Sequence, residues 1–188
     1  MSAFDYVIGL ISIVSSLALT HLVASFVGLL RRGRTIGFSL QHAVWMWTAS
    51  ATTVGNWGSN WSMHDVRVWP AWVVLGSLVL TVGQYAFCVF VSPEPSRDER
   101  VDLATFHRDE GPLYVGAYII LTLLALGSNV LSMNSYSAWL RDSVFCLVGL
   151  LLALASLRGP QWLRLTASSL VAVQSTVFMV LAVQIVSR

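Results

Sequence analysis

Four polar residues recur at four-residue intervals within a stretch otherwise rich in Ala, Trp and Val. Thr52, Asn56, Asn60 and His64 would share one face of a helix, because residues four apart lie one above the other. Their hydroxyl, amide and imidazole groups donate and accept hydrogen bonds without a fixed charge. In a membrane, such a stripe could line a path for a neutral solute, or it could hold helices together.

A second polar stripe lies on the next apolar segment, where Ser77, Thr81, Gln84 and Cys88 also fall on one helix face. Helix-to-helix hydrogen bonding explains either stripe alone. Two successive segments that each carry a stripe favour a shared polar pathway. The candidate pathway therefore comprises Thr52, Asn56, Asn60, His64, Ser77, Thr81 and Gln84.

Two histidines fall inside apolar segments, His21 deep in the first and His42 near the inner end of the second. Both are weak candidates for haem ligands, but membrane cytochromes with two haems need four such histidines. A structural histidine, hydrogen-bonded to a neighbouring helix, is the favoured interpretation. No HExxH, CxxC or glycine-rich phosphate motif is present. The sequence thus predicts no enzyme, no metal and no cofactor.

The first apolar segment carries a ridge of small residues, each four positions apart: Ser12, Ser16, Thr20, Ala24 and Gly28. Small side chains let helix backbones approach closely in lipid, where contacts depend on packing. The ridge predicts a packing surface. We favour packing within the chain, with docking of another subunit as the alternative.

The composition indicates that the bilayer is the solvent. Of 188 residues, 56% are hydrophobic and 11% charged, and the mean hydropathy is +0.71. A soluble protein could not cover so much apolar surface with so few charges. The net charge of +2 is too small to indicate a nucleic-acid partner. All cationic residues are Arg, so chemistry that needs a lysine Schiff base is excluded.

Six segments are long and apolar enough to be transmembrane helices, which need about 20 such residues each. They run over residues 4–30, 37–61, 69–92, 113–133, 137–157 and 162–186. The predicted fold is therefore all-α, a single transmembrane domain over 1–188. The loop 93–112 carries nine of the 20 charged residues and three prolines, and "VDLATFHRDEG" within it could form a short surface helix.

Arginines near the segment ends predict the orientation, because cytoplasmic loops carry more of them. Eight fall on one predicted side: Arg31, Arg32, Arg34, Arg97, Arg100, Arg108, Arg158 and Arg164; Arg67, Arg141 and Arg188 fall on the other. The side with eight should be cytoplasmic. Six spans then place both termini on the outer, periplasmic side.

The opening "FDYVIGLISIVSSLALTHLV", the basic turn "RRGR", the Trp-rich second segment and the loop motif D-L-x-x-x-H carry a family resemblance. The chain resembles a group of bacterial multi-pass inner-membrane proteins with a LALTHL-type first helix. This resemblance covers mainly the first 30 residues or so and the loop motif, and it implies a bacterial inner-membrane location. No established activity accompanies it.

Two functions fit these features. The first is a non-catalytic subunit that packs against itself or against a larger membrane complex, supported by the small-residue ridge and the lack of charge at mid-membrane. The second is a channel or facilitator for a neutral or weakly charged solute, supported by the two polar stripes. A haem-binding or other redox protein is a distant third.

Overall fold

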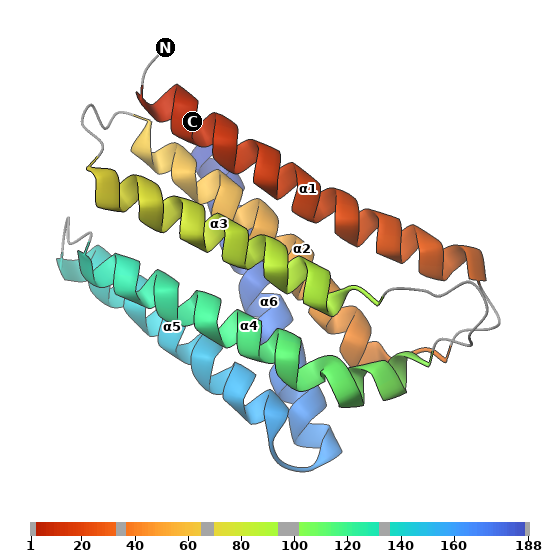
Figure 1. Ribbon diagram of the computed structural model, residues 1–188. Helices are drawn as coiled ribbons and strands as arrows, with labels where there is room; N and C mark the ends of the chain where they lie inside the picture. Colours follow the sequence, from red (N-terminus) through yellow and green to blue (C-terminus); the bar gives the residue numbers. More distant parts are fainter. Residues whose placement is uncertain (1–2, 33–36, 65–69, 94–101, 132–135, 187–188) are drawn as a thin grey trace.

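The computed structural model describes residues 3–32, 37–64, 70–93, 102–131 and 136–186, which form an up-and-down helical bundle (Figure 1). The helices are α1 (Ala3–Arg32), α2 (Leu40–Ser59), the short 3-10 helix η2 (Asn60–Met63), α3 (Ala71–Val91), α4 (Leu103–Leu131), α5 (Tyr136–Leu157) and α6 (Gln161–Val186). Over this part of the chain there is no sheet, only one bridge between Gly37 and Asp102. The all-α prediction is confirmed.

Five helices are long and apolar enough to cross a membrane: α1, α3, α4, α5 and α6. The predicted second span, α2, is not among them. Instead α2 runs through the middle of the bundle in contact with α1, α3, α4 and α6. Trp45, Ala49 and Thr53 on α2 are at most 1% exposed. Because protein surrounds α2, its polar side chains meet other side chains rather than lipid.

The outer surface of the bundle is apolar. Leu30, Leu75, Leu151 and Val173 come from four different helices, and each is more than 60% exposed. Exposed apolar side chains on this scale would favour aggregation in water, whereas lipid tails solvate them. The surface is consistent with membrane insertion.

Helix α4 begins ten residues earlier than predicted. The sequence placed its start at residue 113, after the loop 93–112, but the helix begins at Leu103 and continues through Pro112. Proline removes one backbone hydrogen bond and bends a helix without always ending it. The predicted loop boundary is therefore wrong. The helical turns before Pro112 belong to α4 itself and not to a separate surface helix.

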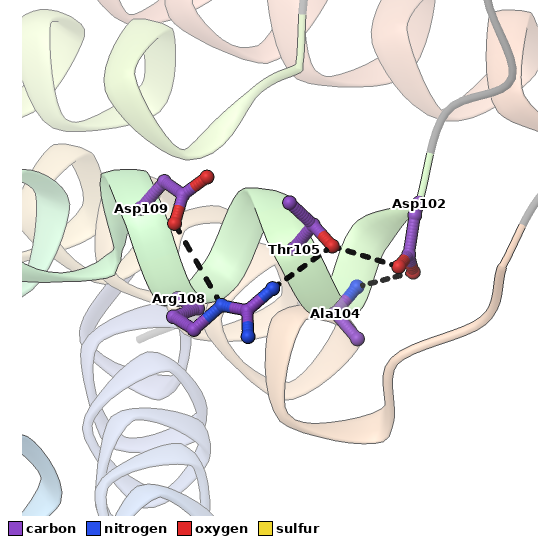
Figure 2. A network of polar contacts seen from close by, with 5 residues as sticks. All are labelled: Asp102, Ala104, Thr105, Arg108 and Asp109. Atoms are coloured by element: carbon purple, nitrogen blue, oxygen red, sulfur yellow. Dashed lines mark hydrogen bonds and ion pairs between the residues drawn. The ribbon is translucent and has the colours of Figure 1, made fainter.

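Asp102 stabilises the start of α4 (Figure 2). Its Oδ1 accepts a hydrogen bond from the Ala104 backbone N–H at 3.0 Å, and its Oδ2 accepts one from the Thr105 hydroxyl at 2.8 Å. These bonds, that of Thr105 first, lower the pKa of the Asp102 carboxyl. Arg108 adds an exposed bond to Thr105 and an exposed ion pair with Asp109. Asp102 thus caps α4 in its ionised form.

Helices α2 and α6 pack closely through two glycines. A Cβ atom added at Gly55 would lie 2.5 Å from Cδ1 of Phe178, and one added at Gly58 would lie 3.2 Å from the backbone carbonyl of Ala182. Both glycines are buried. Small residues therefore allow a close helix contact between α2 and α6.

Only one end of the predicted ridge of α1 packs inside the chain. Ser12 accepts a hydrogen bond from Trp57 of α2, whereas Ser16, Thr20 and Ala24 are exposed and Gly28 is half-buried. The fully buried face of α1 is a different one: Phe4, Val7, Ile11, Ser15, Ala18, Leu22, Ser25 and Leu29. Packing within the chain, the favoured interpretation of the ridge, is therefore seen at Ser12 and not at Thr20 or Ala24. Larger apolar residues on the adjacent face gain more contact area against α2 and α3.

Arginines of the described helices gather at one end of the bundle. Arg31 and Arg32 are the last two residues of α1, Arg108 lies in the first turns of α4, Arg158 follows α5 and Arg164 lies in the first turn of α6. These helix ends lie at the same end of the bundle (Figure 1). Arg141, near the start of α5, lies at the other end. Arg34, Arg67, Arg97, Arg100 and Arg188 fall outside the described residues.

Candidate functional site

Gln84 on α3 forms the centre of a polar cluster with α2. Its Oε1 accepts a hydrogen bond from Asn56 Nδ2 at 2.9 Å. Its Nε2 donates to the hydroxyls of Thr52 and Thr53, at 3.1 and 3.0 Å. Gln84 is 3% exposed. Three residues of the predicted pathway, Thr52, Asn56 and Gln84, therefore do meet.

The other four predicted pathway residues bond within their own segments. Asn60 Nδ2 donates to the Asn56 carbonyl at 2.7 Å, and the Thr81 hydroxyl donates to the Ser77 carbonyl at 2.7 Å. His64 is exposed, and its Nδ1 lies 3.1 Å from the carbonyl oxygen of Trp61. These contacts do not extend the Gln84 cluster toward either end of the bundle.

The Gln84 cluster joins α2 to α3. Thr53 also lies 3.3 Å from the Cys88 sulfur on α3, and its own hydroxyl donates to the Ala49 carbonyl at 2.7 Å. Both ends of the Gln84 amide are thus occupied by protein partners. A buried amide without partners would cost several kcal/mol in lipid. Thr53 was not among the residues predicted to form the pathway, although the sequence shows it next to Thr52 in the most polar segment.

A small cavity lies between α1 and α2. Its volume is about 140 Å³, and its lining is rich in hydroxyl groups: Ser12, Ser15, Ser16, Leu19, Thr53, Val54 and Trp57. The indole N–H of Trp57 donates to the Ser12 hydroxyl at 2.9 Å and ties the two helices together. Because Thr53 also contacts Gln84, this cavity reaches the edge of the Gln84 cluster.

His42 lies in a second polar region, near the start of α2. The side chain is 0% exposed, and neither ring nitrogen has a hydrogen-bond partner among the described residues. Phe106 and Tyr114 of α4 pack edge-on against its ring, with centroids 5.2 and 6.2 Å away. These two aromatic rings cover part of the buried His42 side chain. His21 is half-buried on α1, and its Nε2 also lacks a partner in the described part of the chain.

Three further polar residues lie at the same end of the bundle as His42 (Figure 1), and we call the four residues together the Arg164 cluster: His42, His107, Tyr114 and Arg164. The Tyr114 hydroxyl forms a hydrogen bond with His107 Nδ1. Tyr114 thus links His107 to His42, because its ring also packs against that of His42. The Arg164 Nε is buried without a partner among the described residues. Sequence analysis treated His107 as part of a loop and gave Tyr114 no role in a site.

The Arg164 cluster and the Gln84 cluster differ in how far their hydrogen bonds are satisfied. The Gln84 amide is hydrogen-bonded to its neighbours, whereas His42 and Arg164 keep buried nitrogens without a partner among the described residues. Within the described residues, no group of three or more His, Cys, Asp or Glu side chains could hold a metal ion. No family model, curated protein or solved structure matches this chain.

Proposed function

We propose that this protein is a non-catalytic, six-span subunit of the bacterial inner membrane that docks a second copy, or another membrane subunit, through the exposed ridge of α1. The single observation that carries the proposal is the exposure of Ser16, Thr20 and Ala24. A small-residue ridge at four-residue spacing is the usual contact surface of paired membrane helices. We expect a helix of a second copy, or of another membrane subunit, to pack against the exposed part of this ridge.

The position of α1 in the bundle supports this function. α1 lies at the edge of the bundle and packs on α2 and α3 (Figure 1). Ser12 at one end of the ridge bonds to α2, and the rest of the ridge is exposed or half-buried. Larger apolar residues flank the ridge, among them Ile13 and Leu17, which are 61% and 56% exposed. Small residues between large ones form a groove into which a neighbouring helix can fit.

The oligomeric state tests the proposal. The variant T20L/A24L fills the ridge, and we expect it to dissociate a complex that the unaltered protein forms in mild detergent, as measured by light scattering. Thr166→Leu is the matched control, because Thr166 is an exposed threonine on α6 and its hydroxyl bonds only to its own helix. A monomeric unaltered protein that also captures no membrane partner in cells would refute the proposal.

The six-span topology requires a separate test, because α2 is less apolar than the other helices. Phe38 precedes α2 and Tyr136 begins α5, and they are 72% and 74% exposed. We expect an impermeant maleimide to label Tyr136→Cys in intact cells, and Phe38→Cys only after lysis. Labelling of both in intact cells would overturn the proposed orientation. The unaltered protein is the control, since its cysteines are buried or half-buried.

A second function, a facilitator for a small neutral solute, is supported by the hydroxyl-lined cavity between α1 and α2. This cavity of about 140 Å³ has room for a few water molecules. If solute passes beside Gln84, the variant N56L/N60L should abolish flux into liposomes while the helical content is unchanged. Flux that is absent in the unaltered protein, or that persists in this variant, would rule the facilitator out.

A further inference from the structure

We propose that the hydroxyl-lined cavity between α1 and α2 binds a small uncharged polyol, about the size of glycerol, through the hydroxyl groups of Ser12 and Ser15. The inference rests on the second proposed function, the facilitator, for which it names the class of solute and the residues that hold it. Its support comes from the free hydroxyl groups of the cavity, its volume and its lack of charge.

Ser15 has a buried hydroxyl group that no protein group satisfies. It is 8% exposed and lines the cavity, and no hydrogen bond joins it to another described residue. Ser15 lies near the middle of α1, at a depth where lipid offers no hydrogen-bond partner. The neighbouring Ser16 instead donates to the Ser12 carbonyl at 2.7 Å. Because buried polar groups are usually hydrogen-bonded, the Ser15 hydroxyl indicates an occupant of the cavity.

Ser12 provides a second group for the same occupant. Its hydroxyl oxygen accepts a hydrogen bond from the Trp57 indole N–H at 2.9 Å, and its hydroxyl hydrogen has no acceptor in the described part of the chain. Ser12 and Ser15 are three residues apart, so they lie on the same face of α1. The two serines together offer two donors and further lone pairs. A ligand hydroxyl both donates and accepts, whereas a ligand carbonyl only accepts, so the pair favours an alcohol over a ketone.

The volume of the cavity sets the size of the ligand. It is about 140 Å³. A cavity of about 150 Å³ in a protein core holds one benzene molecule, which has as many non-hydrogen atoms as glycerol. Glycerol and ethylene glycol therefore fit, and a hexose, with twice as many atoms, does not.

The remaining walls suit the carbon atoms of a polyol. Leu19 and Val54 are apolar, and the half-buried Trp57 ring is held in place by its bond to Ser12. None of the residues that line the cavity is charged. An ion without a charged partner is costly to bury, so this lining favours uncharged molecules over phosphates, carboxylates and amines.

The cavity lies between the outside of the bundle and the Gln84 cluster. Ser16 is exposed and lines the cavity, so the cavity reaches the surface of α1 there. Thr53, on the inner side, is 1% exposed, and its hydroxyl lies 3.0 Å from Gln84 Nε2. A polyol held at Ser15 would therefore occupy the position at which a facilitator first desolvates its solute.

Binding of glycerol to the full-length protein in phosphatidylcholine nanodiscs tests the proposal. Saturation-transfer NMR, with irradiation of the aromatic protons of the protein, detects glycerol that binds near them. We expect a signal that saturates at roughly millimolar glycerol, an ordinary affinity for a ligand of so few atoms. The ether 1,2-dimethoxyethane has as many non-hydrogen atoms as glycerol but no donor, and should compete about tenfold more weakly or not at all.

Ser15→Ala removes the free hydroxyl and should weaken glycerol binding about fivefold, because one hydrogen bond is lost. Ser169→Ala is the matched control, because Ser169 is half-buried on α6 and its hydroxyl bonds only to the Leu165 carbonyl of its own helix. The control should change the affinity by no more than about twofold. Val54→Phe fills the cavity from α2 and leaves every serine in place, so it should abolish binding, and it decides if Ser15→Ala fails to fold.

The absence of a saturable glycerol signal, equal losses in Ser15→Ala and Ser169→Ala, or equally tight binding of 1,2-dimethoxyethane would overturn the inference. Flux into liposomes separates its failure from that of the facilitator. Glycerol that binds at Ser15 but does not cross the membrane supports the site and refutes the facilitator. Flux of another neutral solute without saturable glycerol binding supports the facilitator and overturns the polyol site.

Discussion

Replacing Gly58 by alanine should loosen the contact between α2 and α6. A Cβ at this position would lie 3.2 Å from the backbone carbonyl atoms of Ala182 and 3.3 Å from its Cβ. These distances are shorter than ordinary van der Waals contact, and the atoms belong largely to the backbone of α6. Because a backbone cannot turn away as a flexible side chain can, α6 itself must move.

Two opposing effects determine the size of the change. Alanine favours the helix over glycine by about 0.5–1 kcal/mol. Overpacking at a tight contact costs about 1–3 kcal/mol. Gly76 on α3 provides the reference, because nothing lies within 4 Å of a Cβ added there. Gly76→Ala gains the helix preference alone, so the difference between the two variants isolates the packing cost.

Reversible unfolding in mixed micelles measures this difference. We expect Gly58→Ala to be about 1–3 kcal/mol less stable than Gly76→Ala. This corresponds to a midpoint roughly 2–12 °C lower for a chain of this size. Gly58→Val should be less stable still, since it adds two methyl groups at the same contact. If Gly58→Ala equals Gly76→Ala in stability, the close approach of α2 and α6 through this glycine is wrong.

Three further predictions concern the polar contacts and the start of α4. Gly37→Ala should destabilise the fold, because its Cβ would lie 2.6 Å from Asp102 Oδ1; an unchanged unfolding midpoint would contradict this. The pKa of Asp102 is lowered in the folded state, so its cap is fully present above the ordinary Asp pKa of about 3.9 and is lost as the pH falls through the folded value. Asp102→Asn should therefore remove part of the acid sensitivity of unfolding, and an identical pH profile would count against the cap. Gln84→Leu leaves Asn56 unpaired and should cost about 1–2 kcal/mol, whereas Thr81→Val loses only a bond within its own helix; equal stability of the two variants would refute the Gln84 cluster.

The sequence was sufficient to predict an all-helical membrane protein, because long apolar segments have few other stable arrangements. It did not show that the second segment would run through the middle of the bundle. The polarity of α2 was visible, and a polar helix surrounded by protein is the stable arrangement of such a segment in lipid. The start of α4 was misplaced because Pro112 was interpreted as a boundary, although Asp102 supplies a better one.

The spacing of small residues did not predict which helix surfaces meet in the fold. The regular ridge of α1 and the glycine pair of α2 both predict close helix contact. Most of the α1 ridge is exposed, whereas the glycine pair of α2 lies in close contact with α6. Spacing identifies a surface that can pack, but which surfaces meet depends on how all six helices pack together. The same applies to His42 and Tyr114, which are far apart in the chain and whose rings pack together only in the folded bundle.

The two polar clusters differ because of where they lie along the helices. Gln84 is in the middle of α3, where lipid offers no hydrogen-bond partner, so Asn56 and Thr52 must satisfy it. His42 and Arg164 lie in the first turns of their helices, and their buried nitrogens have no partner among the described residues. Buried polar groups are usually hydrogen-bonded, so the two clusters differ in kind. The polar side chains of α2 and α3 around Gln84 satisfy one another and join the two helices, whereas the donors at the arginine-rich end do not.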